Sequence, residues 1–288
     1  MIKMETGGKM TYTYAVKLVA LLDVAFIAFL ILSGYVGGWM GQIIYALAFI
    51  IPLLAGIFCS EEFKRRREEV AGVAEAPDGL LKFTPDIAGK LAPLAAPTVA
   101  IVFLTSLLTS LFLSLFGVTS APVENKGIVT MLIVHALTPA ILEEALFRYL
   151  PMKLILPYSK RFCVFYSAFC FAMIHCSFTQ MPYAFVAGVI FMMIDVALGS
   201  VWPSVILHFI NNAASVIWIK YCGTLLASWI FIGSLVVLVS VSLIFIFGKS
   251  REYRELLGSA FHKGERALYT PALLALVLMS VYLAVTNL

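Results

Sequence analysis

The sequence predicts an all-α protein, a polytopic bundle of eight or nine transmembrane helices. Of its 288 residues, 62% are hydrophobic and only 12% are charged, and the mean hydropathy is +0.99. An average soluble domain carries about twice that fraction of charged residues. The apolar residues also fall into long runs, and about 20 of them in a row suffice to cross a bilayer. Composition and run length therefore exclude a soluble enzyme.

Nine apolar segments can be distinguished along the chain. They lie at residues 15–36, 39–59, 91–117, 128–156, 162–178, 182–198, 201–221, 224–247 and 271–288. The fifth and sixth are short, and if one of them only dips into the membrane the number of spans is eight. The fourth is the longest and contains Pro139 and Pro151, each of which can kink a helix and free a backbone carbonyl.

The distribution of basic residues predicts the orientation, because Lys and Arg favour the cytoplasmic side. With the N-terminus inside, 18 of the 20 Lys and Arg fall on the inner side, leaving Lys126 and Lys220 outside. The charged start of the polar segment 60–90 is interpreted as a solvated topological anchor, with a helix lying on the headgroups as the alternative. We expect a multi-pass protein of the cytoplasmic membrane with a cytoplasmic N-terminus.

Two acids and an arginine occur inside the fourth apolar segment, at Glu143, Glu144 and Arg148. A charge at the centre of a bilayer costs about 2.5 kcal/mol or more, so such groups need a partner or a function. Glu144 and Arg148 are four residues apart on one helix face, which favours an ion pair. Glu143 is turned by about 100° and is the poorer partner. The spacing predicts one neutralised acid and one free acid suited to act as a general base, with a water-filled vestibule as the alternative explanation.

Two further motifs place polar side chains at a similar depth. Phe171 precedes His175 by one turn, and His208 precedes Asn212 by one turn, so each pair shares a helix face. By the rise of a helix, these side chains can meet Glu143 near the middle of the membrane or in its inner half. His208 and Asn212 could donate two hydrogen bonds to one oxygen atom, as an oxyanion hole does. A bond to a neighbouring carbonyl explains any single histidine equally well, but the coincidence of three sites favours a functional role.

Other polar groups receive a structural interpretation. His135 lies on a face about 80° from that of Glu143 and is interpreted as a satisfied helix histidine. Asp23 is interpreted as a packed or snorkelling acid. The five cysteines form no CxxC pair and are interpreted as small residues of membrane helices. Cys176 is a poor candidate nucleophile, because it points about 100° away from its neighbour His175.

Taken in order, the motifs EExxxR, FxxxH and HxxxN, which begin at Glu143, Phe171 and His208, resemble the CPBP family. This family contains the type II CAAX prenyl proteases and the bacteriocin-processing and abortive-infection-like proteins. The resemblance implies that Glu143 activates the attacking water with help from His175. It further implies that His208 and Asn212 stabilise the tetrahedral oxyanion.

The same resemblance also assigns supporting residues and a domain division. The supporting residues are Glu144, Arg148 and Phe171. The chain then divides into N-terminal helices with a basic loop (1–127), a catalytic core (128–221) and C-terminal helices (222–288).

Zinc is a possible cofactor. Glu143, His175 and His208 could form a three-ligand site that leaves a position open for water. The family has been described as metalloproteases, and a metal-free glutamate mechanism is also argued for it. No HExxH pair, which would hold two histidines on one helix face, occurs in the sequence. We favour the metal-free mechanism by a narrow margin.

The sequence therefore predicts an intramembrane endopeptidase acting on a membrane-associated protein or peptide. Prenylated CAAX tails, leader sequences and membrane anchors are all compatible substrates. The expected partners are this substrate and the lipid bilayer, and no nucleic acid. Water must reach the site, so we expect a cavity that opens toward the inner face or laterally. Two other functions stay open: a transporter with a proton relay of Glu143, His175 and Asp195, and a catalytically silent immunity or scaffold protein.

Overall fold

The computed structural model describes residues 6–68, 79–118 and 127–258, together with positions 277, 278, 280, 281 and 285. Its regular elements within these residues are helices, which confirms the all-α class. The elements are α1 (Thr6–Val36), α2 (Gly38–Glu68), α3 (Pro85–Ser114), α4 (Ile128–Leu132), η1 (Ile133–Leu137), α5 (Thr138–Glu144), η2 (Ala145–Tyr149), α6 (Leu150–Leu154), α7 (Lys160–Met173), α8 (Met181–Leu198), α9 (Trp202–Tyr221), α10 (Leu225–Gly248) and α11 (Ser250–Gly258).

The helical stretches fit a polytopic membrane bundle. Within the described residues, six are long and apolar enough to cross a membrane by length and composition. Two predicted spans are not among them: α7 has only 14 residues, and the 20 residues of α9 include the polar motif of His208. The last predicted span, 271–288, lies mostly outside the described residues, as does the outer loop before Ile128.

The charged start of the segment 60–90 prolongs the second span. α2 runs without a break through Glu68, so the alternative of a separate helix on the headgroups is wrong for this part. Lys153 of α6 approaches Glu61 at 3.4 Å, which connects this end of α2 to the fourth span. Residues 69–78, the middle of the predicted loop, lie outside the described residues.

The fourth span is a composite helix, in which the π-helical turns η1 and η2 alternate with the α-helical pieces. Each π-helical turn lies just before a proline, at Pro139 and Pro151. Proline lacks an N–H and its ring clashes with the carbonyl four residues earlier, so the preceding turn widens. In η1 the N–H of Thr138 accordingly bonds to the carbonyl of Ile133, five residues back. The prolines were predicted to kink the helix, and the structure shows that they insert wide turns.

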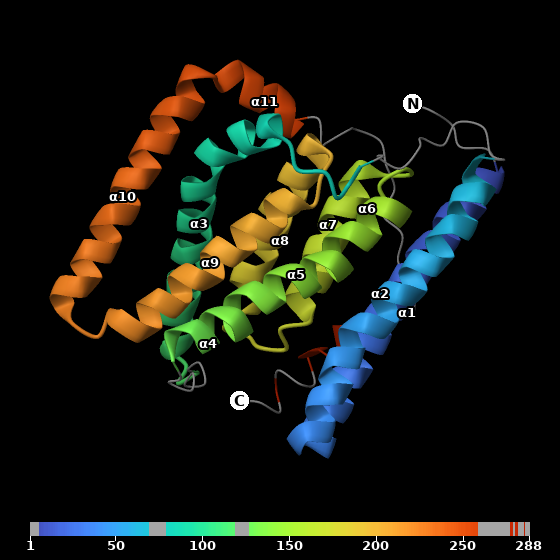
Figure 1. Ribbon diagram of the computed structural model, residues 1–288, viewed down its shortest axis with the longest axis horizontal. Helices are drawn as coiled ribbons and strands as arrows, with labels where there is room; N and C mark the ends of the chain where they lie inside the picture. Colours follow the sequence, from blue (N-terminus) through green and yellow to red (C-terminus); the bar gives the residue numbers. More distant parts are fainter. Residues whose placement is uncertain are drawn as a thin grey trace.

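The ends of the helices fall at two opposite ends of the bundle (Figure 1). At one end lie the N-terminus, the start of α3, the α8–α9 turn and α11. At the other end lie the α1–α2 turn, the end of α3, the start of α4 and the α9–α10 turn. We call these the N-terminal end and the distal end. α11 was not expected from the sequence; its Tyr253 is buried and packs with residues of α3, α8 and α9.

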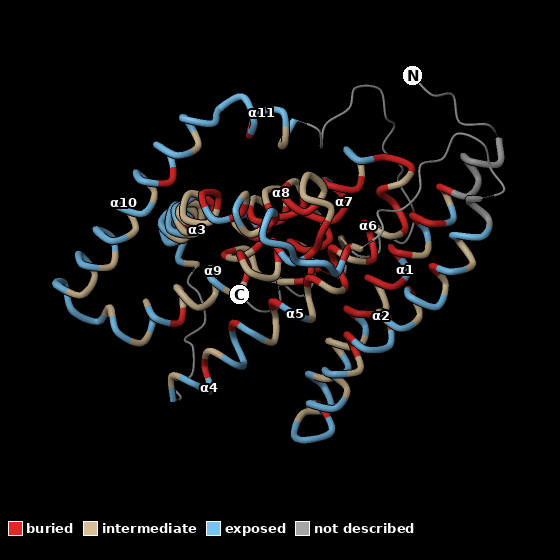
Figure 2. Tube along the Cα trace, turned by 45° about the horizontal axis from the view of Figure 1, so that its top comes forward, coloured by how far each residue is buried: buried red, intermediate tan, exposed pale blue. Residues whose placement is uncertain are grey.

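The core lies around α6, α7 and α8, whereas most of α10 is exposed (Figure 2). α7 and α8 pack closely because Gly188 lies directly against the backbone of Ala168. Asp23 is 1% exposed and accepts a hydrogen bond of 2.8 Å from the Tyr166 hydroxyl, so it is a packed acid and does not snorkel. All five cysteines are free; Cys59, Cys163 and Cys170 are helix residues as expected, whereas Cys176 and Cys222 lie just beyond the ends of α7 and α9.

Candidate functional site

A cavity of about 840 Å³ lies among α3, the fourth span, the end of α7, α8, α9 and α10. Its lining includes the four side chains that the sequence motifs singled out as catalytic: Glu143, His175, His208 and Asn212. These residues come from three separate helical segments and line one cavity. Phe171 also lines this cavity, whereas the other two supporting residues, Glu144 and Arg148, lie behind its wall.

The cavity occupies the distal half of the bundle. Its lining draws on residues 102–110 of α3, 134–143 of the fourth span, and 208–219 of α9. In each helix these are the residues nearer the distal end. The cavity therefore extends from Glu143 and His208 away from the N-terminal end.

Glu143 is the free acid of the doublet. It is partly buried and lines the cavity, and its Oε2 atom is buried without a hydrogen-bond partner in the described part of the chain. A buried carboxylate oxygen with no protein partner is costly unless a water molecule or a substrate group supplies the missing bond. The geometry therefore fits a carboxylate that binds water in the cavity.

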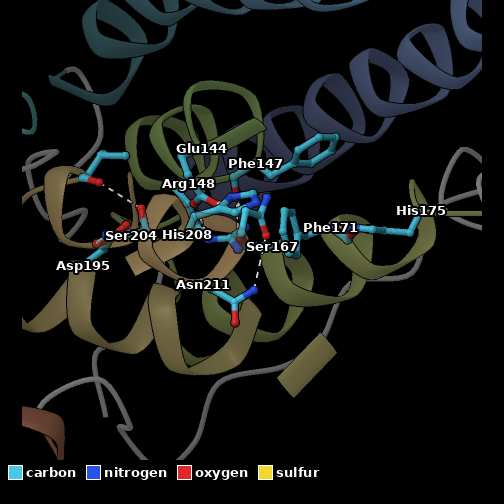
Figure 3. Close-up of polar contacts among 12 residues, drawn as sticks. Glu144, Phe147, Arg148, Ser167, Phe171, His175, Asp195, Ser204, His208 and Asn211 are labelled. Carbon is cyan, nitrogen blue, oxygen red and sulfur yellow. Dashed lines mark hydrogen bonds and ion pairs between the residues drawn. The ribbon is translucent and has the colours of Figure 1, made fainter. Parts of the chain in front are cut away.

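Glu144 is the neutralised acid, as predicted, but it has a second partner. Its Oε2 lies 3.1 Å from Arg148 Nε, and both side chains are fully buried. These two atoms form a close ion pair that is not aligned as a hydrogen bond. The other oxygen, Oε1, accepts a hydrogen bond of 2.7 Å from Nδ1 of His208 (Figure 3). Arg148 is thus a buried partner of the site, and its inclusion among the basic residues of the inner side was wrong.

The bond to Glu144 fixes how His208 can act. A carboxylate only accepts, so Nδ1 of His208 carries the proton, and in the neutral ring Nε2 is an acceptor. An oxyanion donor at Nε2 therefore requires the imidazolium form of His208. The His208 pairing was missed at the sequence level, because the two residues are 64 positions apart and no spacing rule connects them.

His175 lies just beyond the end of α7. The predicted helix was to continue through residue 178, but α7 ends at Met173. The N–H groups of His175 and Cys176 bond to carbonyls three residues back, and Cys176 takes a left-handed φ of 46°. A chain in this conformation leaves the helix.

Phe171 still contacts His175 as expected. Their ring centroids are 5.1 Å apart, and His175 Nδ1–H donates to the Phe171 carbonyl at 2.8 Å. His175 therefore presents Nε2 as an acceptor when it is neutral. In Figure 3, Phe171 lies between His175 and the cluster of Glu144, Arg148 and His208.

Asn212 is oriented by its neighbour. The amide of Asn211 donates to Oδ1 of Asn212 at 3.3 Å, and both side chains line the cavity. Since this bond occupies the Asn212 oxygen, the Asn212 amide N–H groups remain to act as donors. The structure therefore adds Asn211, which the motifs did not single out, to the lining of the cavity.

His135 is the functional candidate that sequence reasoning set aside. It is exposed and lines the cavity, so the interpretation as a satisfied helix histidine is wrong. The calculation of its face assumed a regular α-helix between His135 and Glu143. The π-helical turn η1 accommodates one extra residue. The eight residues that separate His135 from Glu143 therefore span about the same rotation as seven residues of an α-helix, which is about two full turns, and the two side chains share a face. The proline at 139 was the available signal.

Asp195 does not join the cavity. It is fully buried, and its Oδ1 accepts a hydrogen bond of 2.9 Å from the backbone N–H of Ser204, in the first turn of α9. A carboxylate in this place stabilises a helix N-terminus. The transporter hypothesis required Asp195 beside Glu143 and His175, and the lining of the cavity includes only the latter two.

The positions of the donor side chains decide whether the cavity could hold a metal ion. In residues 6–68, 79–118 and 127–258, no three His, Cys, Asp or Glu side chains are grouped closely enough to hold a metal ion. Nδ1 of each site histidine is engaged, in His208 by Glu144 and in His175 by Phe171, which leaves Nε2 as the nitrogen that could bind a metal ion. Glu143, His175 and His208 are not grouped as a metal site in this part of the chain, and no step below uses a metal.

The fold and the cavity together define a polytopic helical membrane protein with an acid and three histidines in the lining of one cavity. Residues 125–214 match the model of a protein family described as type II CAAX prenyl endopeptidase Rce1-like. This match covers the stretch that carries the three motifs and supports their resemblance to the CPBP family of intramembrane proteases. No curated protein and no solved structure gives a significant match to the chain.

Proposed function

We propose that the protein is a CAAX-type intramembrane endopeptidase in which Glu143 activates water for the hydrolysis of a membrane-associated protein or peptide. One observation carries this proposal: a single cavity is lined by Glu143, His175, His208 and Asn212. An acid, a neutral histidine acceptor and two potential oxyanion donors are the groups that peptide hydrolysis requires. The substrate is a segment of a membrane-associated chain, and its flanking residues would contact the rest of the cavity.

In the proposed mechanism, Glu143 accepts a proton from a water molecule that Nε2 of His175 holds by a second hydrogen bond. The hydroxide equivalent attacks the scissile carbonyl carbon, and the carbonyl oxygen becomes an oxyanion. The Asn212 amide and protonated His208 donate hydrogen bonds to that oxyanion. Glu143 then passes its proton to the amine leaving group as the C–N bond breaks. The products are one new carboxyl terminus and one new amino terminus.

The mechanism proposed here is metal-free. We expect cleavage by the purified protein to continue at an unchanged rate after chelator treatment and removal of the chelated metal. Loss of cleavage that returns on addition of Zn²⁺ would contradict the metal-free mechanism and would show that Glu143, His175 and His208 rearrange to bind the ion.

The function is tested by comparing the termini of membrane proteins in cells that contain the wild-type chain or Glu143→Gln. Gln keeps the size of the side chain but cannot accept the proton, so a set of termini seen with the wild type should be missing. Glu61→Gln, a change on the exposed end of α2, is the matched control and should retain them. Identical termini for the wild type and a correctly inserted Glu143→Gln would favour a catalytically silent immunity or scaffold protein.

A further inference from the structure

Ser167 of α7 is a buried residue that does not line the cavity but contacts the residues behind it. Its side chain is fully buried. The hydroxyl donates a short hydrogen bond to the carbonyl of Phe147 and accepts one of 3.0 Å from Nη1 of Arg148. A serine hydroxyl has one proton and two lone pairs, so it can make both bonds at once.

The carbonyl that Ser167 binds is the one that Pro151 sets free. Pro151 lies four residues after Phe147 and has no N–H to offer it, so the normal helical bond cannot form. Nη1 of Arg148 donates to the same carbonyl at 3.2 Å. The freed carbonyl, the Ser167 hydroxyl and the guanidinium therefore form a closed set of three contacts inside the protein (Figure 3).

The guanidinium of Arg148, which Ser167 holds in place, also contacts residues next to the cavity. Its central carbon lies 4.5 Å from the centre of the Phe171 ring, and its Nε lies 3.1 Å from Glu144. Glu144 in turn holds Nδ1 of His208 at 2.7 Å. Ser167 is therefore joined to His208 through two intermediate residues, all of them buried. Removal of its hydroxyl would deprive Arg148 of an acceptor in a place where water does not replace it.

We propose that Ser167 is a positioning residue of the site, which holds Arg148 so that Glu144 keeps the Nδ1 proton and the ring orientation of His208. The importance of His208 for cleavage rests on the proposed function. The positions of Ser167, Arg148, Glu144 and His208 do not depend on the proposed function. The positioning role and the proposed function can therefore be tested separately.

The test uses the full-length protein labelled with ¹⁵N-histidine in detergent micelles, comparing the wild type with Ser167→Ala. The His208 signals are those missing in His208→Gln. We expect His208 to carry a proton on Nδ1 in the wild type, in the neutral or the imidazolium form, and a fraction of the Nε2–H tautomer to appear in Ser167→Ala. Ser60→Ala is the matched control, because Ser60 is also buried but bonds only to a carbonyl of its own helix, and it should leave the spectrum unchanged. An unchanged His208 spectrum in Ser167→Ala would overturn the proposal.

Kinetics give the second readout. With a substrate identified from the terminal comparison, kcat of Ser167→Ala should fall on the order of ten- to a hundredfold with little change in KM, as expected for a misplaced group. A wild-type kcat for the folded Ser167→Ala fraction would assign Ser167 a purely structural role and overturn the proposal.

If Ser167→Ala does not fold, Pro151→Ala replaces it, since the restored N–H competes for the Phe147 carbonyl and should shift the same His208 signals. If Glu143→Gln cleaves normally while these signals shift, only the proposed function fails.

Discussion

At the scale of single residues, two adjacent glutamates have different environments because a helix turns about 100° per residue. Glu143 faces the cavity with an unpartnered oxygen, whereas Glu144 is fully buried between Arg148 and His208. The same residue type therefore suits proton transfer at one position and charge compensation at the next.

This difference predicts opposite effects on stability. Glu144→Gln removes the charge that compensates a fully buried guanidinium, and breaking such a pair costs about 3–5 kcal/mol. Glu143→Gln leaves that pair intact and should change the free energy of unfolding little. Chemical unfolding of both variants in detergent checks this expectation. Equal stability of the two variants would mean that Glu144 does not compensate Arg148.

At the scale of helices, the close packing of α7 on α8 keeps Ser167 and Phe171 in place. An added Cβ at Gly188 would lie 2.8 Å from the Cα of Ala168, and backbone cannot move aside easily. Gly188→Ala should therefore destabilise the protein by about 1–3 kcal/mol through overpacking. Gly233→Ala in α10, where the added Cβ meets nothing within 4 Å, is the control and should be neutral or slightly stabilising. Thermal unfolding in one detergent compares the two, and a neutral Gly188→Ala would contradict the close packing.

Sequence reasoning predicted the helices well and the internal geometry of the fourth span poorly. Apolar run length and the i, i+4 spacing rest on local geometry, so the helical class and the Glu144–Arg148 pair followed from them. The π-helical turn before Pro139 changes the face of every earlier residue, and for that reason His135 was misplaced. The bond between Glu144 and His208 depends on tertiary packing between separate helices, which no local pattern contains.

At the scale of the whole molecule, charge distribution and cavity position can be combined. Apart from the buried Arg148, 14 of the 15 Lys and Arg in the described residues lie nearer the N-terminal end by chain order, and Lys220 is the exception. If that end is cytoplasmic, as the basic residues predict, the cavity extends toward the outer leaflet. Of the two openings expected from the sequence, the lateral one then remains, and the one toward the inner face gives way to an outward opening.

This orientation is measurable with two cysteines in a Cys222→Ser background. Ser110→Cys lines the cavity, and Glu61→Cys lies at the N-terminal end. In intact cells a membrane-impermeant thiol reagent should label Ser110→Cys, and it should label Glu61→Cys only after permeabilisation. The reverse pattern would place the N-terminal end outside and the cavity in the cytoplasmic half.

The central claim is that Glu143 and its neighbours in the cavity hydrolyse a peptide bond with water. The most direct measurement incubates membranes that contain the wild type or Glu143→Gln in H₂¹⁸O and analyses new carboxyl termini by mass spectrometry. We expect new termini that carry one ¹⁸O atom with the wild type, and a loss of these termini with Glu143→Gln. Formation of the same labelled termini at the same rate by Glu143→Gln would contradict the account.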